Sequence, residues 1–138
     1  MTSTGALHTQ LSLVGAPRVL VVDAERVESV TLALAHARRR LRLPAFAIHW
    51  ASRLGASMGE AWWYDDGRVE VCLNTTVDVS KIAWVLLHEA CHVSQGRQYC
   101  GRYTREAEDA ANEFAFAVTD RETDEFLLLN RRRLLRRR

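Results

Sequence analysis

Three residues with the spacing of a metal-assisted hydrolase lie in the second half of this 138-residue chain, where His88, Glu89 and His92 form an H-E-x-x-H motif. Residues four apart lie on the same face of an α-helix, so the two imidazoles can point at one metal ion. The glutamate lies at the rim of that face, where it can reach a water beside the metal. The motif therefore predicts a zinc site with the chemistry of peptide-bond hydrolysis.

The segment that carries the motif has the pattern of a buried helix. It runs from Asp78 to Gln95, with Thr76 or Asp78 as its N-cap and Gly96 as its stop. Residues 82–87 are apolar on every side, which is typical of a helix inside a core. Histidines and a glutamate in such a helix need partners, because an unsatisfied buried polar group costs roughly 1–3 kcal/mol. A metal ion would satisfy all three.

A third protein ligand is expected, because catalytic zinc usually takes three and leaves one position open. Residues 104–119 are predicted to form a second helix with acids in its first turn, where the helix dipole favours them. We choose Glu108 as the third ligand, with Glu106 as the competing candidate and Glu113 as a weaker one. Asn112 would then orient one imidazole through its second ring nitrogen.

The reaction also calls for a group that stabilises the oxyanion. The sequence does not choose among four candidates for this role: Tyr99, Tyr103, Arg105 and His49. Cys91 lies inside the motif, and we interpret it as a small buried apolar residue in preference to a metal ligand.

Two stretches together resemble the ImmA/IrrE family of small zinc metallopeptidases. These are L-H-E-A-C-H at residues 87–92 and E-A-E-D-A-A-N-E-F-A at residues 106–115. The family pairs H-E-x-x-H with a downstream E-x-x-A-N-x-F-A stretch. The chain departs from the family at Cys91, where a glycine is common, and at residues 118–120, where Leu-Leu-x-Pro is common. The SprT-like group is a competing relative.

The resemblance covers roughly residues 58–118 and carries several implications. It implies a gluzincin-type zincin in which His88, His92 and Glu108 hold one Zn²⁺ and Glu89 is the general base. It also implies a protein substrate with a regulatory role, such as a repressor or another DNA-binding regulator.

Upstream of the motif the apolar pattern changes to that of strands. Asp-Gly at residues 66–67 between two such runs is a strong hairpin signal. We expect an antiparallel sheet of about three strands, whose edge would hold a peptide by strand addition. The predicted strands are Phe46–Trp50, Gly59–Tyr64 and Arg68–Asn74. Three tryptophans, which either line the cleft or fill the core, are Trp62, Trp63 and Trp84.

Residues 17–130 are interpreted as one zincin-like α+β domain, which follows a flexible N-terminus at residues 1–16 and precedes a basic tail at residues 131–138. A short strand at residues 19–22 is predicted to lead into an N-terminal helix, which Asp23 caps and Pro44 follows. The sheet, the motif helix, the glutamate-bearing helix and a C-terminal helix or tail come next.

Charge divides the chain into two parts. Residues 1–130 hold 13 Lys+Arg against 17 Asp+Glu, a net charge of −4, and the tail at residues 131–138 adds six arginines. Such a tail can bind nucleic acid or anionic lipid, and the alternative is that it is the frayed end of a last helix that begins at Asp124. The alternative function is therefore a zincin-fold protein with weak or no peptidase activity that binds nucleic acid or protein through this tail.

The three cysteines cannot all pair, and no signal-peptide pattern or membrane-spanning apolar run is visible. We therefore expect a cytoplasmic protein with free thiols and no membrane span. Eighteen of the nineteen basic residues are arginine, a coding bias that indicates a bacterial or phage origin.

Overall fold

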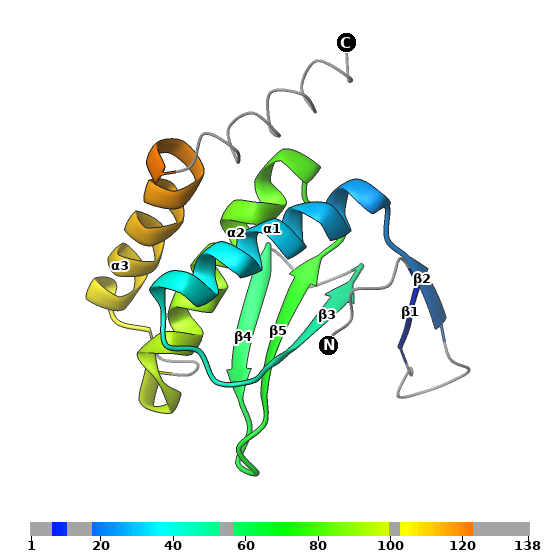
Figure 1. Ribbon diagram of the computed structural model, residues 1–138. Helices are drawn as coiled ribbons and strands as arrows, with labels where there is room; N and C mark the ends of the chain where they lie inside the picture. The colour runs from blue at the N-terminus through cyan, green and yellow to red at the C-terminus, as the bar shows by residue number, and fades with distance from the viewer. Residues whose placement is uncertain (1–6, 11–17, 53–56, 100–102, 123–138) are drawn as a thin grey trace.

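The computed structural model of the protein describes residues 7–10, 18–52, 57–99 and 103–122, which form an α+β fold (Figure 1). Its elements follow in this order: β1 (Leu7–Gln10), β2 (Arg18–Val21), α1 (Ala24–Arg40), β3 (Ala47–Ala51), β4 (Gly59–Trp63), β5 (Val69–Asn74), α2 (Val79–Gln95), η1 (Arg97–Tyr99), α3 (Arg105–Phe116) and η2 (Ala117–Glu122). The predicted N-terminal helix, motif helix and glutamate-bearing helix are confirmed as α1, α2 and α3.

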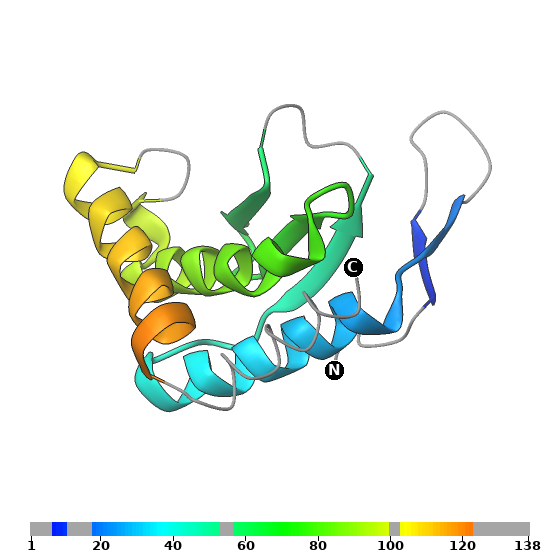
Figure 2. The same ribbon diagram turned by 90° about the horizontal axis from the view of Figure 1, so that it is seen from above.

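Helix α2 is the element on which the others pack. Figure 2 shows it between α1 on one side and strands β4 and β5 on the other, and α3 crosses near its C-terminal end. Every residue from Val85 to Val93 is buried. The prediction that this helix is apolar on every side because it lies in the core is therefore confirmed.

Side-chain caps start all three helices, at the residues whose types favour that position. The Asp23 carboxylate accepts a hydrogen bond from the backbone N–H of Arg26, at 2.9 Å, at the start of α1. Asp78, one of the two predicted caps, accepts from the N–H of Ser80 at the start of α2, which ends at Gly96 as predicted. Thr104 caps α3.

The three-stranded sheet is mixed, so the prediction of an antiparallel sheet is wrong in one pairing. Its order is β3-β5-β4, with β4 antiparallel and β3 parallel to β5. The hairpin signal fixed only the β4–β5 pair, where Gly67 takes the expected positive φ of 89°. The segment between β3 and β4 is long enough that these two strands need not pair with each other. Strand β3 pairs instead with β5, the strand of this sheet with the most buried residues.

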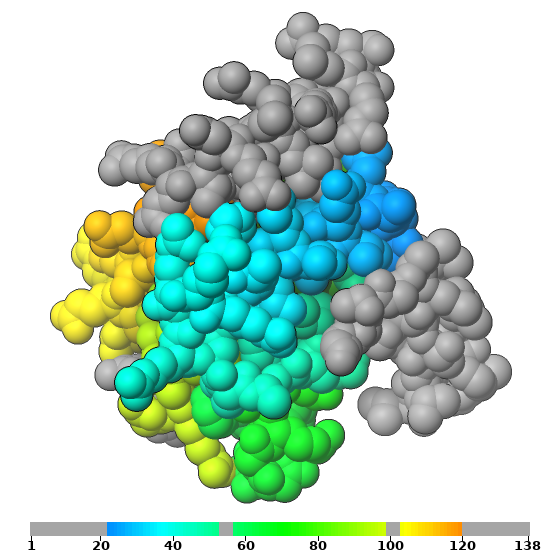
Figure 3. Space-filling view, viewed as in Figure 1, coloured from blue at the N-terminus to red at the C-terminus, as the bar shows by residue number. Residues whose placement is uncertain are grey.

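Alternation along β5 gives the sheet one buried face. Val69, Val71 and Leu73 point into the core and are at most 4 % exposed. Ile48 and Trp50 of β3 join them, while the residues between face the other side. The sheet and α1 thus enclose α2, and α1 covers much of the face seen in Figure 3. Strand β4, the last in the strand order, is an edge strand of the sheet and lies beside α2.

The N-terminal region contains an element that the sequence did not indicate. Strand β1 pairs antiparallel with β2, the predicted short strand before α1, and forms a separate two-stranded sheet. The predicted tail at residues 131–138 and the C-terminal helix lie outside the described residues. Within the described ranges, no helix is both long enough and apolar enough to cross a membrane.

We predict that Leu73→Ala destabilises the fold by about 2–5 kcal/mol, because it leaves a cavity at a fully buried position between the sheet and α2. Urea unfolding followed by circular dichroism measures this change. Lys81→Ala, an exposed change on α2, serves as the control and should stay within about 0.5 kcal/mol of the wild type. Equal effects of the two substitutions would contradict this account of the core.

Candidate metal centre

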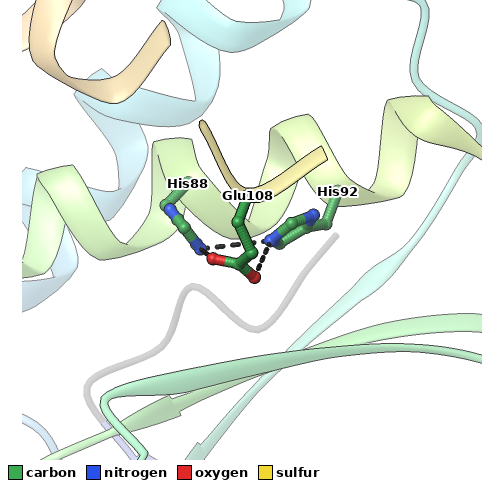
Figure 4. A group of neighbouring side chains, drawn as sticks. All are labelled: His88, His92 and Glu108. Carbon is green, nitrogen blue, oxygen red and sulfur yellow. Dashed lines mark hydrogen bonds and ion pairs between the residues drawn. The ribbon is translucent and has the colours of Figure 1, made fainter. Parts of the chain in front are cut away.

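Two histidines of α2 and one glutamate of α3 converge on one point (Figure 4). The Nε2 atoms of His88 and His92 are 3.1 Å apart. Glu108 places Oε1 at 2.9 Å from Nε2 of His92 and Oε2 at 3.4 Å from Nε2 of His88. Among the described residues, these three form the group of side chains that could hold a metal ion.

The spacing of these atoms fits a tetrahedral divalent cation. Ligand atoms that lie about 2.0–2.1 Å from such an ion are about 3.3 Å from one another. The three separations are 2.9, 3.1 and 3.4 Å, so they lie on both sides of that value and close to it. Two imidazoles and one carboxylate are also a donor set that suits zinc.

Local structure explains why the three side chains meet. His88 and His92 are one helical turn apart on α2, so their rings project from the same face. Glu108 lies in the first turn of α3, just after the Thr104 cap. Because α3 packs across α2, that first turn is brought over the two histidines. The preferred third ligand of the sequence prediction thus lies at the site.

The competing ligand candidates do not reach the histidines. Glu106 and Glu113 are both exposed on α3, and neither belongs to the metal-capable group found within the described residues. Cys91 is buried on another side of α2, and its burial raises the pKa of its thiol. It lies outside that group too, consistent with its interpretation as a small buried residue.

Glu89 lies beside the metal group, almost out of contact with solvent. Its carboxylate Oε2 is 3.9 Å from Nε2 of His88. Burial, together with the nearby negative charges of Glu108 and Glu60, raises the pKa of Glu89 to about 8. A cation held by the two histidines would lower that pKa again, because it favours the ionised carboxylate. Burial thus favours the protonated carboxyl group, and a bound cation would favour the carboxylate.

A cleft of about 600 Å³ opens over the metal group. One wall is the edge strand β4 with the residues just before it, and the opposite wall comes from Tyr103 and α3. Strand β4 approaches α2 so closely at Gly59 that an added Cβ would lie 2.7 Å from the Val85 side chain and 3.2 Å from Cγ of Glu89. Glycine is therefore required where the strand passes the predicted general base.

Each histidine is backed by an aromatic ring. Trp84, one turn earlier on α2, stacks on His88 with ring centroids 5.1 Å apart. Tyr103 stacks on His92 at 3.8 Å. Both aromatic residues also line the cleft, together with the exposed Trp62, whereas Trp63 packs against the core. These contacts limit the rotation of the two imidazoles.

The surroundings of His88 favour the neutral form of its imidazole. Burial lowers the pKa of His88, the like charge of His92 lowers it further, and Glu108 opposes both effects. Asn112, predicted to orient an imidazole, also interacts with this ring and acts to raise the pKa of His88. The buried Nδ1 of His88 nevertheless has no hydrogen-bond partner within the described part of the chain.

A residue that the sequence analysis did not single out holds the second histidine. Gln95 lies three residues after His92, and its Oε1 is 2.7 Å from Nδ1 of that ring. Its Nε2 donates to the backbone carbonyl of Ala107 on α3, at 2.8 Å. The i, i+3 spacing on a helix was a usable signal for this contact.

The four oxyanion candidates have different locations. Tyr103 lines the cleft, but its hydroxyl donates to the Ala61 carbonyl of β4 at 3.3 Å. His49 lies on the far face of the sheet, where it pairs with Glu70 at 2.7 Å. Arg105 is exposed on α3. Tyr99 belongs to η1, and its side chain lies outside the described part.

The chain was compared with known protein families, curated proteins and solved structures. No protein-family model, no curated protein and no solved structure matches this chain. The functional interpretation therefore depends on the motif and on the contacts described above.

We predict that His88→Ala and Glu108→Ala each abolish stoichiometric zinc binding, because each removes one of three converging ligands. Metal content after dialysis against zinc, measured by inductively coupled plasma mass spectrometry, tests this. Glu106→Ala and Glu113→Ala are matched controls on the same helix and should keep the metal. Retention of zinc by Glu108→Ala with its loss from Glu106→Ala would refute the assignment.

We also predict a pH effect on the metal-free protein. The folded pKa of Glu89 is raised to about 8 from its ordinary value of 4.5, so the stability that it contributes is present below about pH 4.5 and is lost as the pH rises through 8. Glu89→Gln removes this titration. The free energy of unfolding of the variant, relative to that of the wild type, should therefore increase as the pH rises from 5 to 8.5. Urea unfolding with a chelator present measures this difference. A difference that stays constant across this range would contradict the buried carboxyl.

Proposed function

We propose that this chain is a zinc-dependent metallopeptidase, a minimal gluzincin that resembles the ImmA/IrrE family. The observation that carries the proposal is the convergence of His88, His92 and Glu108 with Glu89 beside them. Two histidines and a glutamate, with one position left for water, are a donor set of catalytic zinc in peptidases. The zincin-like arrangement of sheet, motif helix and glutamate-bearing helix belongs to the same proposal.

The chemistry divides between the ion and the protein. When bound, zinc would lower the pKa of a coordinated water towards ~7 and polarise the scissile carbonyl. Glu89 would take a proton from the attacking water and deliver it to the leaving amine. Its position beside His88, with a pKa raised by burial, supports both transfers. Tyr103 lines the cleft and is the candidate that best fits an additional role at the oxyanion.

The form of the cleft supports a peptide as substrate. Strand β4 lies at the edge of the sheet and forms one wall of the cleft, so an extended peptide can pair with it as an added strand. Gly59 lets this strand pass directly over the catalytic side of α2. In this pose the scissile bond would lie between the strand and the metal group.

The acidic lining of the cleft favours a peptide over nucleic acid as its ligand. Three glutamates line the cleft, and no lysine or arginine lines it among the described residues: the acids are Glu60, Glu89 and Glu108. Nucleic acid binds chiefly through cations that neutralise its phosphates. A cytoplasmic regulatory protein, such as a repressor, remains the class of substrate that we propose.

We predict that Glu89→Gln keeps zinc and loses at least 10²-fold in cleavage rate, on the order of the contribution of a general base. The assay follows cleavage of a proteome-derived peptide library by mass spectrometry, with the zinc-loaded protein. Glu113→Gln, an exposed change on α3, is the control and should cut like the wild type.

The same assay separates the two functions. If zinc-loaded wild type and Glu89→Gln are equally inert towards the library, the peptidase proposal fails. If, in addition, deletion of residues 131–138 abolishes binding to double-stranded DNA, the binding role through the arginine tail is the correct one.

A further inference from the structure

The hydrogen bonds of Gln95 determine whether Nδ1 of His92, one of the three converging side chains, carries a hydrogen. The backbone oxygen of Ala107 can only accept a hydrogen bond, so the amide end that faces it, at 2.8 Å, must be the NH₂ group. The carbonyl end of the same amide therefore faces Nδ1 of His92, at 2.7 Å. Because a carbonyl oxygen can only accept, Nδ1 of His92 must carry a hydrogen.

In the neutral ring, a hydrogen on Nδ1 leaves the lone pair on Nε2. This atom lies 2.9 Å from Oε1 of Glu108 and 3.1 Å from Nε2 of His88, where a shared cation would replace these contacts. A metal ion requires that lone pair. The stacked ring of Tyr103 limits how far the imidazole can turn out of this position.

Gln95 also links the two ligand-bearing helices. It lies on α2, and its hydrogen bond reaches the residue next to Glu108 on α3. One side chain thus contacts one ligand directly and holds the backbone beside another. The matching ligand His88 has no such partner on its buried Nδ1 within the described residues, so the two histidines differ in how they are held.

We propose that Gln95 is a positioning residue that fixes His92 as the Nδ1–H tautomer and holds Glu108 in register, so that the metal site is preformed. The inference rests on the metal site of the proposed function. It does not depend on whether the site cleaves peptides. Loss of a hydrogen-bond partner of a ligand histidine typically lowers metal affinity about 10–100-fold.

Two substitutions separate the two contacts of Gln95. Gln95→Met has a similar length and loses both hydrogen bonds. Gln95→Glu keeps an acceptor for His92 and loses the donor to Ala107. Gln98→Met, an exposed glutamine three residues later, is the control. Zinc affinity is measured by competition with a chelator, and the melting temperature of each metal-free protein shows whether the fold is retained.

We expect Gln95→Met to bind zinc about 10–100-fold more weakly, and Gln95→Glu to bind within a few-fold of the wild type. Zinc binding by Gln95→Met within twofold of the wild type would overturn the proposal. Equal losses in both variants would trace the effect to the Ala107 contact and would overturn the claim that the His92 contact sets the affinity. If the wild type itself binds no zinc, the proposed function fails first, which distinguishes the two failures.

A measurement on the wild type covers the case in which Gln95→Met does not fold. ¹⁵N NMR of histidine-labelled protein reports the tautomer of His92 directly, through the shifts of its two ring nitrogens. We expect a protonated Nδ1 in both the metal-free protein at pH 7.5 and the zinc-loaded protein. A hydrogen on Nε2 alone in the metal-free protein would contradict the arrangement.

Discussion

The structure depends on one constraint, which is the presence of ionisable side chains in a helix that lies inside the core. Helix α2 contacts α1, α3 and the sheet, and every residue from Val85 to Val93 is buried. Polar groups taken out of water must find partners or lower their charge. His88 and Glu89 show this effect, because burial shifts the pKa of each towards the neutral form. The rest of the site consists of the partners that these groups need.

Those partners come from α3, from the edge strand β4 and from the end of α2 itself. Helix α3 brings Glu108 over the two histidines, and Gln95 joins that helix to His92. Strand β4 stays at the sheet edge and approaches at Gly59, which leaves a cleft where a larger residue would push against Glu89. An ordinary core would close this space. Here a buried polar cluster keeps one side open to solvent.

The sequence predicted most of the elements, and the three side chains that converge, because both follow from local rules. The spacing of His88 and His92, the caps at Asp23 and Asp78, and the Asp-Gly turn each involve residues a few positions apart. Glu108 was chosen only because the two histidines made a third ligand necessary. The metal itself and the peptidase activity remain proposals.

What the sequence could not supply depends on contacts between distant segments. The parallel pairing of β3 with β5 follows from competition among strands for the central position, which no local pattern records. The stacking of Tyr103 on His92 and the close approach at Gly59 arise from tertiary packing. His49 was proposed near the site because of its type, yet strand alternation places it on the opposite face, paired with Glu70.

The central claim is that one divalent cation is held by three particular atoms. Anomalous diffraction at the zinc absorption edge, from crystals grown with one equivalent of zinc, tests it most directly. The account predicts a single anomalous peak about 2.0–2.2 Å from Nε2 of His88, Nε2 of His92 and a carboxylate oxygen of Glu108. A peak elsewhere, or none between these residues at full zinc loading, would contradict it.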